Sequence, residues 1–270
     1  MHLRSLGYQT DLMLPRFDGI ILDRGDYLVI QSPANPLYYW GHFLLFPKPP
    51  ESSDFERWRQ LFAAEFCALP HVKHIALGWD APDDAQGEIQ PFLDAGFDCF
   101  QDRVMAAECV NPPPHPNASI QMGALQTDAQ WAAAFELHLR CHGNDDPTGD
   151  LTFVRSQWAR YRAMTQAGCG VWFGAYLGEQ LVGSLGVIVE GKLGCIQEVS
   201  THPAFRRQGI CGTLLHYASQ HGFQELGAQQ LVIVPVAEYN AAQIYASIGY
   251  RQVEWQSGLT WWEGIEQHPF

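Results

Sequence analysis

The sequence predicts an α/β protein, in which strands and helices alternate along the chain, and it predicts two related halves. Short apolar runs of strand length alternate with longer segments whose apolar residues recur at helical spacing. Hydrophobic residues make up 47% of the 270 residues, which is enough for a packed core. Residues 111–117 contain four prolines, which neither a helix nor a central strand tolerates, so this segment is expected to be a linker.

The second half opens with a strand and two helices. Residues 119–126 have the pattern of a strand. Thr127 then begins a helix that extends to about His142, and Gln130 stands three residues on, as in a capping box. Residues 151–167 predict another helix, because large apolar side chains recur there at helical spacing.

Three strands in succession come next. Residues 171–200 predict them, with tight hairpin turns at Gly178 and Gly191. A turn rich in arginine and glycine leads into the next predicted helix, over about residues 210–220. Residues 231–236 then form a short, fully apolar run, which is typical of a buried strand.

The ends of the two halves resemble each other. The second half ends with a helix and two strands, expected over residues 240–247, 250–256 and 259–264. Phe92 precedes Gly96 by four residues, just as Tyr245 precedes Gly249, and a strand-like run lies upstream of each pair. In the first half, three strands and a helix are expected over residues 19–25, 27–32, 38–46 and 54–66.

This order matches the second half from its second strand onward. It indicates a tandem duplication, although chance explains the likeness about equally well, because aromatic–glycine–aromatic patterns are common. The two halves differ after the third strand of the first half, where prolines follow and no glycine occurs between Pro47 and Gly78. The first half therefore lacks the glycine-containing turn of the second.

Composition excludes several classes of function. The formal net charge of −13 argues against nucleic acid as a partner, because phosphate backbones need a basic footprint, and it is compatible with a cationic substrate. The seven cysteines are odd in number and form no C-x-x-C pair, which is typical of a reduced, intracellular protein. No apolar run suits a signal peptide or a membrane span, so a cytoplasmic location without a membrane partner is expected.

The turn over residues 206–212, RRQGICG, has the features of an anion site. A helix N-terminus exposes about four unpaired N–H groups and about half a positive charge, and glycine lets a ligand approach the backbone. Together these predict binding of a phosphate or pyrophosphate. No lysine follows the glycines as in a nucleotide-binding P-loop, and the chain contains no G-x-G-x-x-G, so an NTPase and a dinucleotide dehydrogenase are excluded.

Residues 200–215, STHPAFRRQGICGTLL, resemble motif A of the GNAT superfamily of acyl-CoA-dependent N-acyltransferases, whose pattern is Q/R-x-x-G-x-G/A after a strand. Cys211 stands at the sixth position, where the family has Gly or Ala, and its small side chain is expected to preserve the loop. Residues 244–250, IYASIGY, follow at the family's distance, and the resemblance covers about residues 119–263.

The resemblance implies an α/β (α+β) fold with a mixed twisted sheet flanked by helices, present in two tandem copies. It also implies that the strand ending at Thr201 splays from the strand over 231–236, and that the pantetheine arm of acetyl-CoA lies in the wedge between these two strands. Pro235 suits a diverging strand or an edge position equally. The expected cofactor-binding residues are Val199, Ser200, Thr201, Arg206, Arg207, Gln208, Gly209, Ile210, Cys211, Gly212 and Thr213.

Two residues are candidates for proton transfer. Glu198, at the end of the same strand and beside an expected bulge, is the first candidate base; its alternative is an ion pair with Arg206 or Arg207. Tyr245 matches the tyrosine that protonates the leaving thiolate in many family members; its alternative is packing onto the sheet. Phe92 holds that place in the first half without a hydroxyl, which suggests a copy that no longer catalyses.

Acidic residues are candidates for the acceptor site. Asp145 and Asp146 lie between the two helices that border this site in the family, where a solvated turn is an equal alternative. Glu238 replaces the asparagine that contacts the cofactor arm in many members and is a candidate for contact with substrate. His138, Cys141, His142 and Asp145 have spacings that a metal could use, but no metal is expected.

The predicted activity is transfer of an acetyl group from acetyl-CoA to a primary amine of a small molecule or amino acid, by direct attack in a ternary complex. The alternative is an acyl-CoA-binding sensor or scaffold without turnover. The predicted domains are a degenerate GNAT-like domain over residues 1–110, the linker over 111–117 and the catalytic GNAT domain over 118–270. The sequence leaves the oligomeric state open, a homodimer included.

Overall fold

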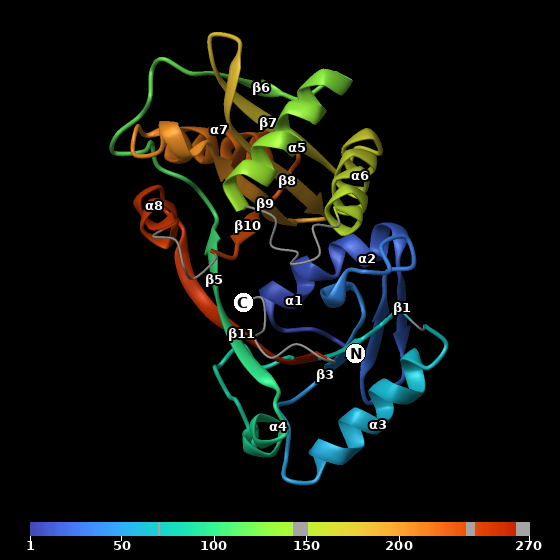
Figure 1. The fold of residues 1–270 in the computed structure, drawn as a ribbon. Coiled ribbons are helices and arrows are strands. Elements are labelled where there is room, and N and C mark those ends of the chain that lie inside the picture. The colour runs from blue at the N-terminus through green and yellow to red at the C-terminus, as the bar shows by residue number, and fades with distance from the viewer. Residues whose placement is uncertain (70, 143–150, 236–240, 263–270) are drawn as a thin grey trace. The chain divides into compact units, whose positions relative to one another are not determined.

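The computed structural model describes residues 1–69, 71–142, 151–235 and 241–262 (Figure 1). They form two compact units. Unit 1 comprises Met1–Val104, Thr152–Ser156 and Glu254–Phe270, and unit 2 comprises Met105–Leu151 and Gln157–Val253. No helix among the described residues is long and apolar enough to cross a membrane.

Unit 2 is built on a mixed sheet. Its strands are β6 (Gln121–Ala124), β7 (Gly170–Leu177), β8 (Gln180–Glu190), β9 (Leu193–Thr201), β10 (Gln230–Ile233) and the last three residues of β5 (Asp98–Ala107). Neighbours pair antiparallel in that order, except that β9 and β10 are parallel. Its helices are α5 (Asp128–His142), α7 (Ile210–Gln224), α8 (Ala241–Ser247) and, from Gln157 onward, α6 (Thr152–Gln166). In Figure 1, α5 and α7 lie on opposite faces of this sheet.

Unit 1 repeats this order without the first strand. Its strands are β1 (Ile20–Asp23), β2 (Leu28–Gln31), β3 (Phe43–Phe46), β4 (His74–Trp79) and the end of β11 (Arg251–Trp262). Neighbours pair antiparallel in that order, except that β3 and β4 are parallel. This is the pattern of β7, β8, β9, β10 and β5 in unit 2. Its helices are α1 (Leu6–Asp11), α2 (Met13–Asp18), α3 (Asp54–Phe66) and α4 (Gln90–Asp94). The predicted correspondence from the second strand onward is therefore confirmed.

The last strands of the two predicted halves are exchanged. β5 follows α4 in the first half, yet its residues Met105–Ala107 pair with β10 of unit 2. β11 follows α8 in the second half, yet its residues Gly258–Trp262 pair with β4 of unit 1. Each unit is thus completed by a strand from the other predicted half.

Local signals in the sequence account for several element boundaries. The capping box at the start of α5 is present: the Gln130 N–H donates to the Thr127 hydroxyl, and the Gln130 side chain accepts from the Thr127 N–H. Gly178 and Gly191 have positive φ at the hairpin turns between β7, β8 and β9, as expected.

One expectation about the elements was wrong. The strands predicted separately over 250–256 and 259–264 are one continuous strand, β11. Gly258 is not at a turn there; a side chain at this position would overlap the Phe100 ring. The helices α1 and α2 were not predicted at all.

The core of unit 1 is aromatic. Phe46 on β3 stacks on Trp58 of α3, with ring centroids 3.8 Å apart. Phe92 is fully buried and packs edge-on against Phe55 and Phe97. The residue that corresponds to Tyr245 in the first half is therefore part of this core.

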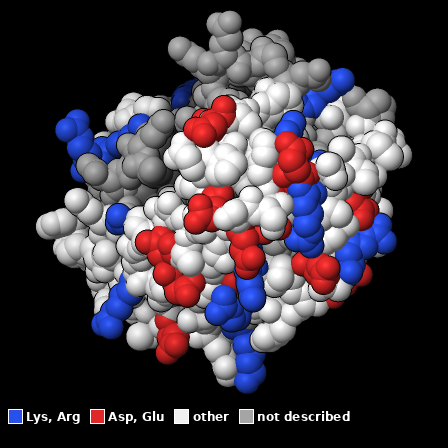
Figure 2. All heavy atoms as spheres, turned by 90° about the horizontal axis from the view of Figure 1, so that it is seen from below, with Lys and Arg blue, Asp and Glu red and all other residues white. Residues whose placement is uncertain are grey.

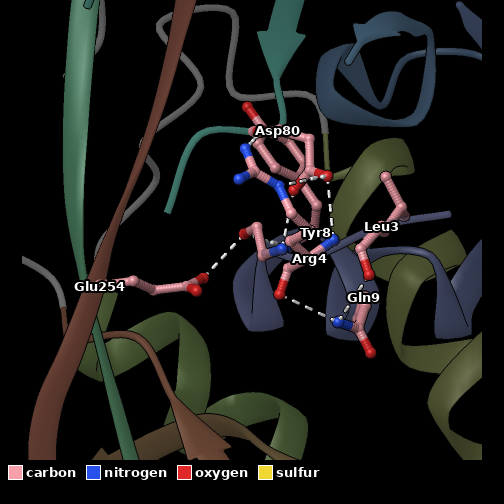
Figure 3. A network of polar contacts seen from close by, with 7 residues as sticks. Leu3, Arg4, Tyr8, Gln9, Asp80 and Glu254 are labelled. Atoms are coloured by element: carbon pink, nitrogen blue, oxygen red, sulfur yellow. Dashed lines mark hydrogen bonds and ion pairs between the residues drawn. The ribbon is translucent and has the colours of Figure 1, made fainter. Parts of the chain in front are cut away.

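Two carboxylates hold the start of α1 within unit 1 (Figure 3). Asp80, which follows β4, accepts hydrogen bonds from the N–H groups of Arg4 and Ser5 at 2.9 and 2.7 Å. Glu254 of β11 accepts from the Ser5 hydroxyl at 2.7 Å and from the Gly7 N–H at 2.9 Å. Both carboxylates are buried, and their bonds satisfy N–H groups that a helix start leaves without partners.

Charged side chains of both signs lie interspersed on the face drawn in Figure 2. The whole chain has 29 acidic and 16 basic residues, excluding histidine. A protein that binds a phosphate backbone clusters its lysines and arginines instead, so the described side chains of this face do not form such a footprint.

Candidate active site

The parallel strands β9 and β10 of unit 2 pair over a short stretch only. Their pairing extends from Leu193 opposite Gln230 only to Cys195 opposite Val232. β9 then continues to Thr201, whereas β10 ends at Ile233. The backbone of β9 beyond Cys195 therefore has no β10 partner, and the splay that the resemblance implied stays a prediction. Pro235 lies just beyond the end of β10, where its missing N–H costs no ladder bond.

A β-bulge lies on β9 beyond its pairing with β10. Gly186 of β8 pairs with Gln197, and Ser184 pairs with Ser200, so one residue of β8 faces two of β9. Glu198 is one of these two and has a φ of 52°, an uncommon value for a residue with a side chain. The expected bulge is present, and bulges often redirect a side chain next to an active site.

The Glu198 carboxylate lies against two residues from the helices of unit 2. Its Oε2 is 3.2 Å from Nδ1 of His138 on α5. Its Oε1 accepts a hydrogen bond of 3.1 Å from the Tyr161 hydroxyl on α6. That hydroxyl in turn accepts from the Gln157 side chain at 3.0 Å. Three elements that are distant in the sequence thus hold one carboxylate.

This arrangement suits proton transfer. The side chains of Glu198 and His138 are 24% and 14% exposed, so both are mostly withdrawn from water while part of the carboxylate is still accessible. The Tyr161 ring packs on Trp172, with centroids 4.7 Å apart, and the His138 ring lies 5.4 Å from Trp158. A carboxylate that accepts a hydrogen bond from Tyr161 and lies among aromatic rings can accept a proton at a defined position.

The turn before α7 has the backbone of an anion-binding loop. Arg207 and Gly209 have φ values of 61° and 76°, and Gly209 is the N-cap of α7. Thr213 closes the first helical turn: its N–H and its hydroxyl both donate to the Gly209 carbonyl, at 3.0 and 2.8 Å. The loop leads from β9 into a helix of 15 residues, the context that a pyrophosphate site needs.

Two cysteines adjoin Thr201 at the end of β9. The Cys141 thiol donates to the Thr201 carbonyl at 3.3 Å, and the Arg206 side chain donates to the same oxygen. Burial raises the pKa of Cys211 to about 11, although an interaction with the Thr201 side chain lowers it slightly. Cys211 is therefore a neutral, small side chain at neutral pH.

Tyr245 lies on α8 and is 5% exposed. Burial raises its pKa well above the usual range, and the neighbouring Cys211 and Tyr250 raise it further. The tyrosine is therefore protonated at any working pH and stands beside the sixth position of the loop. This location fits both readings of the sequence, a proton donor and a packing residue.

The structure places the predicted residues in two connected groups. One contains Glu198 with the helices α5 and α6, and the other contains the α7 loop with Tyr245; the end of β9 joins them. The candidate substrate residues Asp145, Asp146 and Glu238 lie outside the described residues. Where the chain is described, His, Cys, Asp and Glu side chains form no group of three that could hold a metal ion.

Sequence reasoning missed two members of the site. His138 was considered only as one residue of a metal-like spacing, and Tyr161 only as part of the apolar stripe of its helix. The pair Gln157 and Tyr161, four residues apart on α6, was a usable signal, since a polar group beside a tyrosine on a buried face calls for a partner.

Comparisons with known proteins agree with this geometry. Residues 131–250 match the model of the acetyltransferase (GNAT) family. A functionally unknown conserved protein from Staphylococcus epidermidis is similar in structure, with a TM-score of 0.72 at 14% identity over 92% of this chain and 95% of that one. A GCN5-related N-acetyltransferase from Kribbella flavida gives a TM-score of 0.69 at 13% identity over 96% of both chains.

A tandem GNAT protein from the clavulanic acid biosynthesis pathway is also similar, with a TM-score of 0.57 at 12% identity over 96% of this chain and 89% of that one. At these identities the likeness shows the fold alone. No curated protein sequence matches this chain.

Proposed function

We propose that the chain, whose residues 131–250 match the model of the acetyltransferase (GNAT) family, moves an acetyl group from acetyl-CoA to a primary amine of a small molecule or amino acid. The observation that carries this proposal is the end of β9, which continues beyond its pairing with β10 and has Glu198 at its bulge. The loop before α7, which suits a pyrophosphate, adjoins the same strand end through Thr201 and Cys211.

In the proposed reaction, Glu198 takes a proton from the bound ammonium, because only the neutral amine is a nucleophile. His138 and Tyr161 hold the carboxylate in place for this transfer. The amine nitrogen attacks the thioester carbonyl, whose oxygen accepts hydrogen bonds from backbone N–H groups of Val199–Thr201 as it gains charge. The carbon–sulfur bond then breaks, and Tyr245 gives its proton to the departing thiolate. The nitrogen loses its second proton as the amide forms; this proton replaces the one that Tyr245 gave, by way of solvent, and the proton on Glu198 is released to solvent.

We propose that the two halves of the chain have different roles. The second, residues 118–270, is the catalytic copy. The first, residues 1–110, is a degenerate copy, because Phe92 is buried in its core and prolines replace the glycine loop. All seven cysteines are free thiols in the structure, which supports a reducing compartment, the cytoplasm.

The test is thiol release from acetyl-CoA with a panel of amines that includes amino acids, diamines and aminosugars. Because the seven free cysteines of the protein react with thiol reagents, the Glu198→Gln variant at equal concentration is the blank. Release that depends on one class of amine and on Glu198 supports the proposal. Binding of acetyl-CoA without release across the panel would instead assign a sensor or scaffold.

A further inference from the structure

The proline-rich segment 111–117, called the strap from here on, is fixed to unit 2 at both ends. At its start, the Asn111 N–H donates to the Ile248 carbonyl behind α8 at 2.8 Å. At its end, Asn117 makes hydrogen bonds to the loop before α7. The prolines between these points restrict φ and have no N–H, so the strap is stiff and does not compete for backbone partners. It is therefore a built element rather than a loose connection.

Asn117 bonds with both its backbone and its side chain. Its side-chain amide donates to the Gln208 carbonyl at 2.8 Å, and its N–H donates to the Thr213 hydroxyl at 2.9 Å. Its side-chain oxygen accepts from the Ser119 N–H at 2.9 Å, which fixes the orientation of the amide. The same Thr213 hydroxyl donates to the Gly209 carbonyl. Asn117 thus joins the loop to the first turn of α7.

The strap also packs directly on the loop glycines. A side-chain carbon at Gly209 would overlap the His115 carbonyl oxygen, and one at Gly212 would lie 3.4 Å from Pro113. The glycine at 209 therefore permits the approach of the strap as well as a φ of 76°.

Peptide geometry gives these contacts a consequence for binding. The Gln208 carbonyl and the Gly209 N–H belong to one planar trans peptide, so they point in opposite directions. When Asn117 holds the carbonyl, it also fixes the direction of that N–H. Arg207 and Gly209 both have positive φ, a conformation in which the loop is not held by helical hydrogen bonds alone. An external contact is therefore what selects the orientation of this peptide.

We propose that Asn117 is a positioning residue for the pyrophosphate of CoA: it holds the Gln208–Gly209 peptide so that the Gly209 N–H faces the anion. This inference rests on the proposed function, because it takes the loop to be the pyrophosphate site. It assigns to the strap a direct role in cofactor affinity.

The test compares Asn117→Ala with Asn111→Ala, which removes the same side chain from the other end of the strap. Calorimetry with CoA is expected to show about fivefold weaker binding for Asn117→Ala, the size of one ordinary hydrogen bond, and unchanged binding for Asn111→Ala. In turnover assays of Asn117→Ala, the KM for acetyl-CoA is expected to rise and kcat to stay unchanged. With acetyl-pantetheine, which lacks the pyrophosphate, the KM for the acetyl donor is expected to be the same in the two variants and in the wild type. A general loss of structure would instead raise the KM for both acetyl-CoA and acetyl-pantetheine.

Asn117→Asp separates the two uses of the side chain. It keeps an oxygen for the Ser119 N–H but lacks the amide that holds Gln208, so CoA affinity is expected to fall at least as far as in Asn117→Ala. Wild-type affinity in either variant overturns the inference, and so does tighter binding, which would mean that the strap competes with CoA. If the wild type itself does not bind CoA, the proposed function fails, and this inference with it.

Discussion

Gly209→Ala should weaken CoA binding through the backbone, and the effect can be estimated from its conformation. Gly209 has a φ of 76°, a region that costs a residue with a side chain about 1–2 kcal/mol. The added methyl group would also overlap the His115 carbonyl oxygen, so the loop or the strap must move. Because CoA binding requires the original loop, the backbone cost alone corresponds to roughly 5- to 30-fold weaker affinity, and displacement of the strap adds to it.

Gly178→Ala is the matched control. Gly178 also has a positive φ, 59°, but a methyl group there would meet no other atom within 4 Å, and the residue lies in the hairpin between β7 and β8. Gly178→Ala should lose about 1–2 kcal/mol of unfolding free energy in urea titrations and keep its CoA affinity. Only Gly209→Ala should lose CoA affinity by calorimetry. Equal CoA affinity in Gly209→Ala and the wild type would refute the assignment of this loop.

Three further predictions concern proton transfer and stability. Tyr245→Phe should bind CoA normally but turn over about 10²-fold more slowly. The factor should be similar from about pH 6 to 9, because burial keeps the pKa of Tyr245 above that range. Wild-type turnover in this variant would mean that Tyr245 is only a packing residue. Glu198→Gln should lose activity most at low pH, and raising the pH should restore part of it; a pH-independent loss contradicts the base role. Burial lowers the pKa of His74 to about 4, so wild-type stability falls as pH drops from about 6.5 towards 4, because the unfolded chain binds the proton first. Between about pH 7.5 and 5, wild type should lose about 2 kcal/mol more unfolding free energy than His74→Gln, and parallel losses would refute this.

The elements that the sequence predicts well carry their own local signals. The helix α5 has its capping box, and the hairpins have glycines that adopt positive φ. The helices α1 and α2 were missed because each has only six residues, too few to show a helical period, and Pro15 stands inside α2. The separate strands predicted over 250–256 and 259–264 are one strand, in which Gly258 leaves room for the Phe100 ring, and no local pattern reveals this packing.

The residues of the candidate site also divide into those that the sequence predicts and those that only the fold brings together. The loop before α7 and Glu198 lie within one short segment, so a motif identifies them. His138 and Tyr161 reach the carboxylate only because α5, α6 and β9 fold together. The contact of Asn117 with Gln208 spans 91 positions in the sequence, and a linker composition gives no indication of it.

The exchange of the last strands has a consequence for synthesis on the ribosome. β4 can pair with β3 soon after both are made. The other edge of β4 has no partner until Gly258–Trp262 of β11, near the end of the chain, have been synthesised. At about 5–20 residues per second this delay is roughly 10–40 s, during which an apolar strand edge can join another nascent chain. A premature stop that removes only β11 would therefore damage the unit that was translated first.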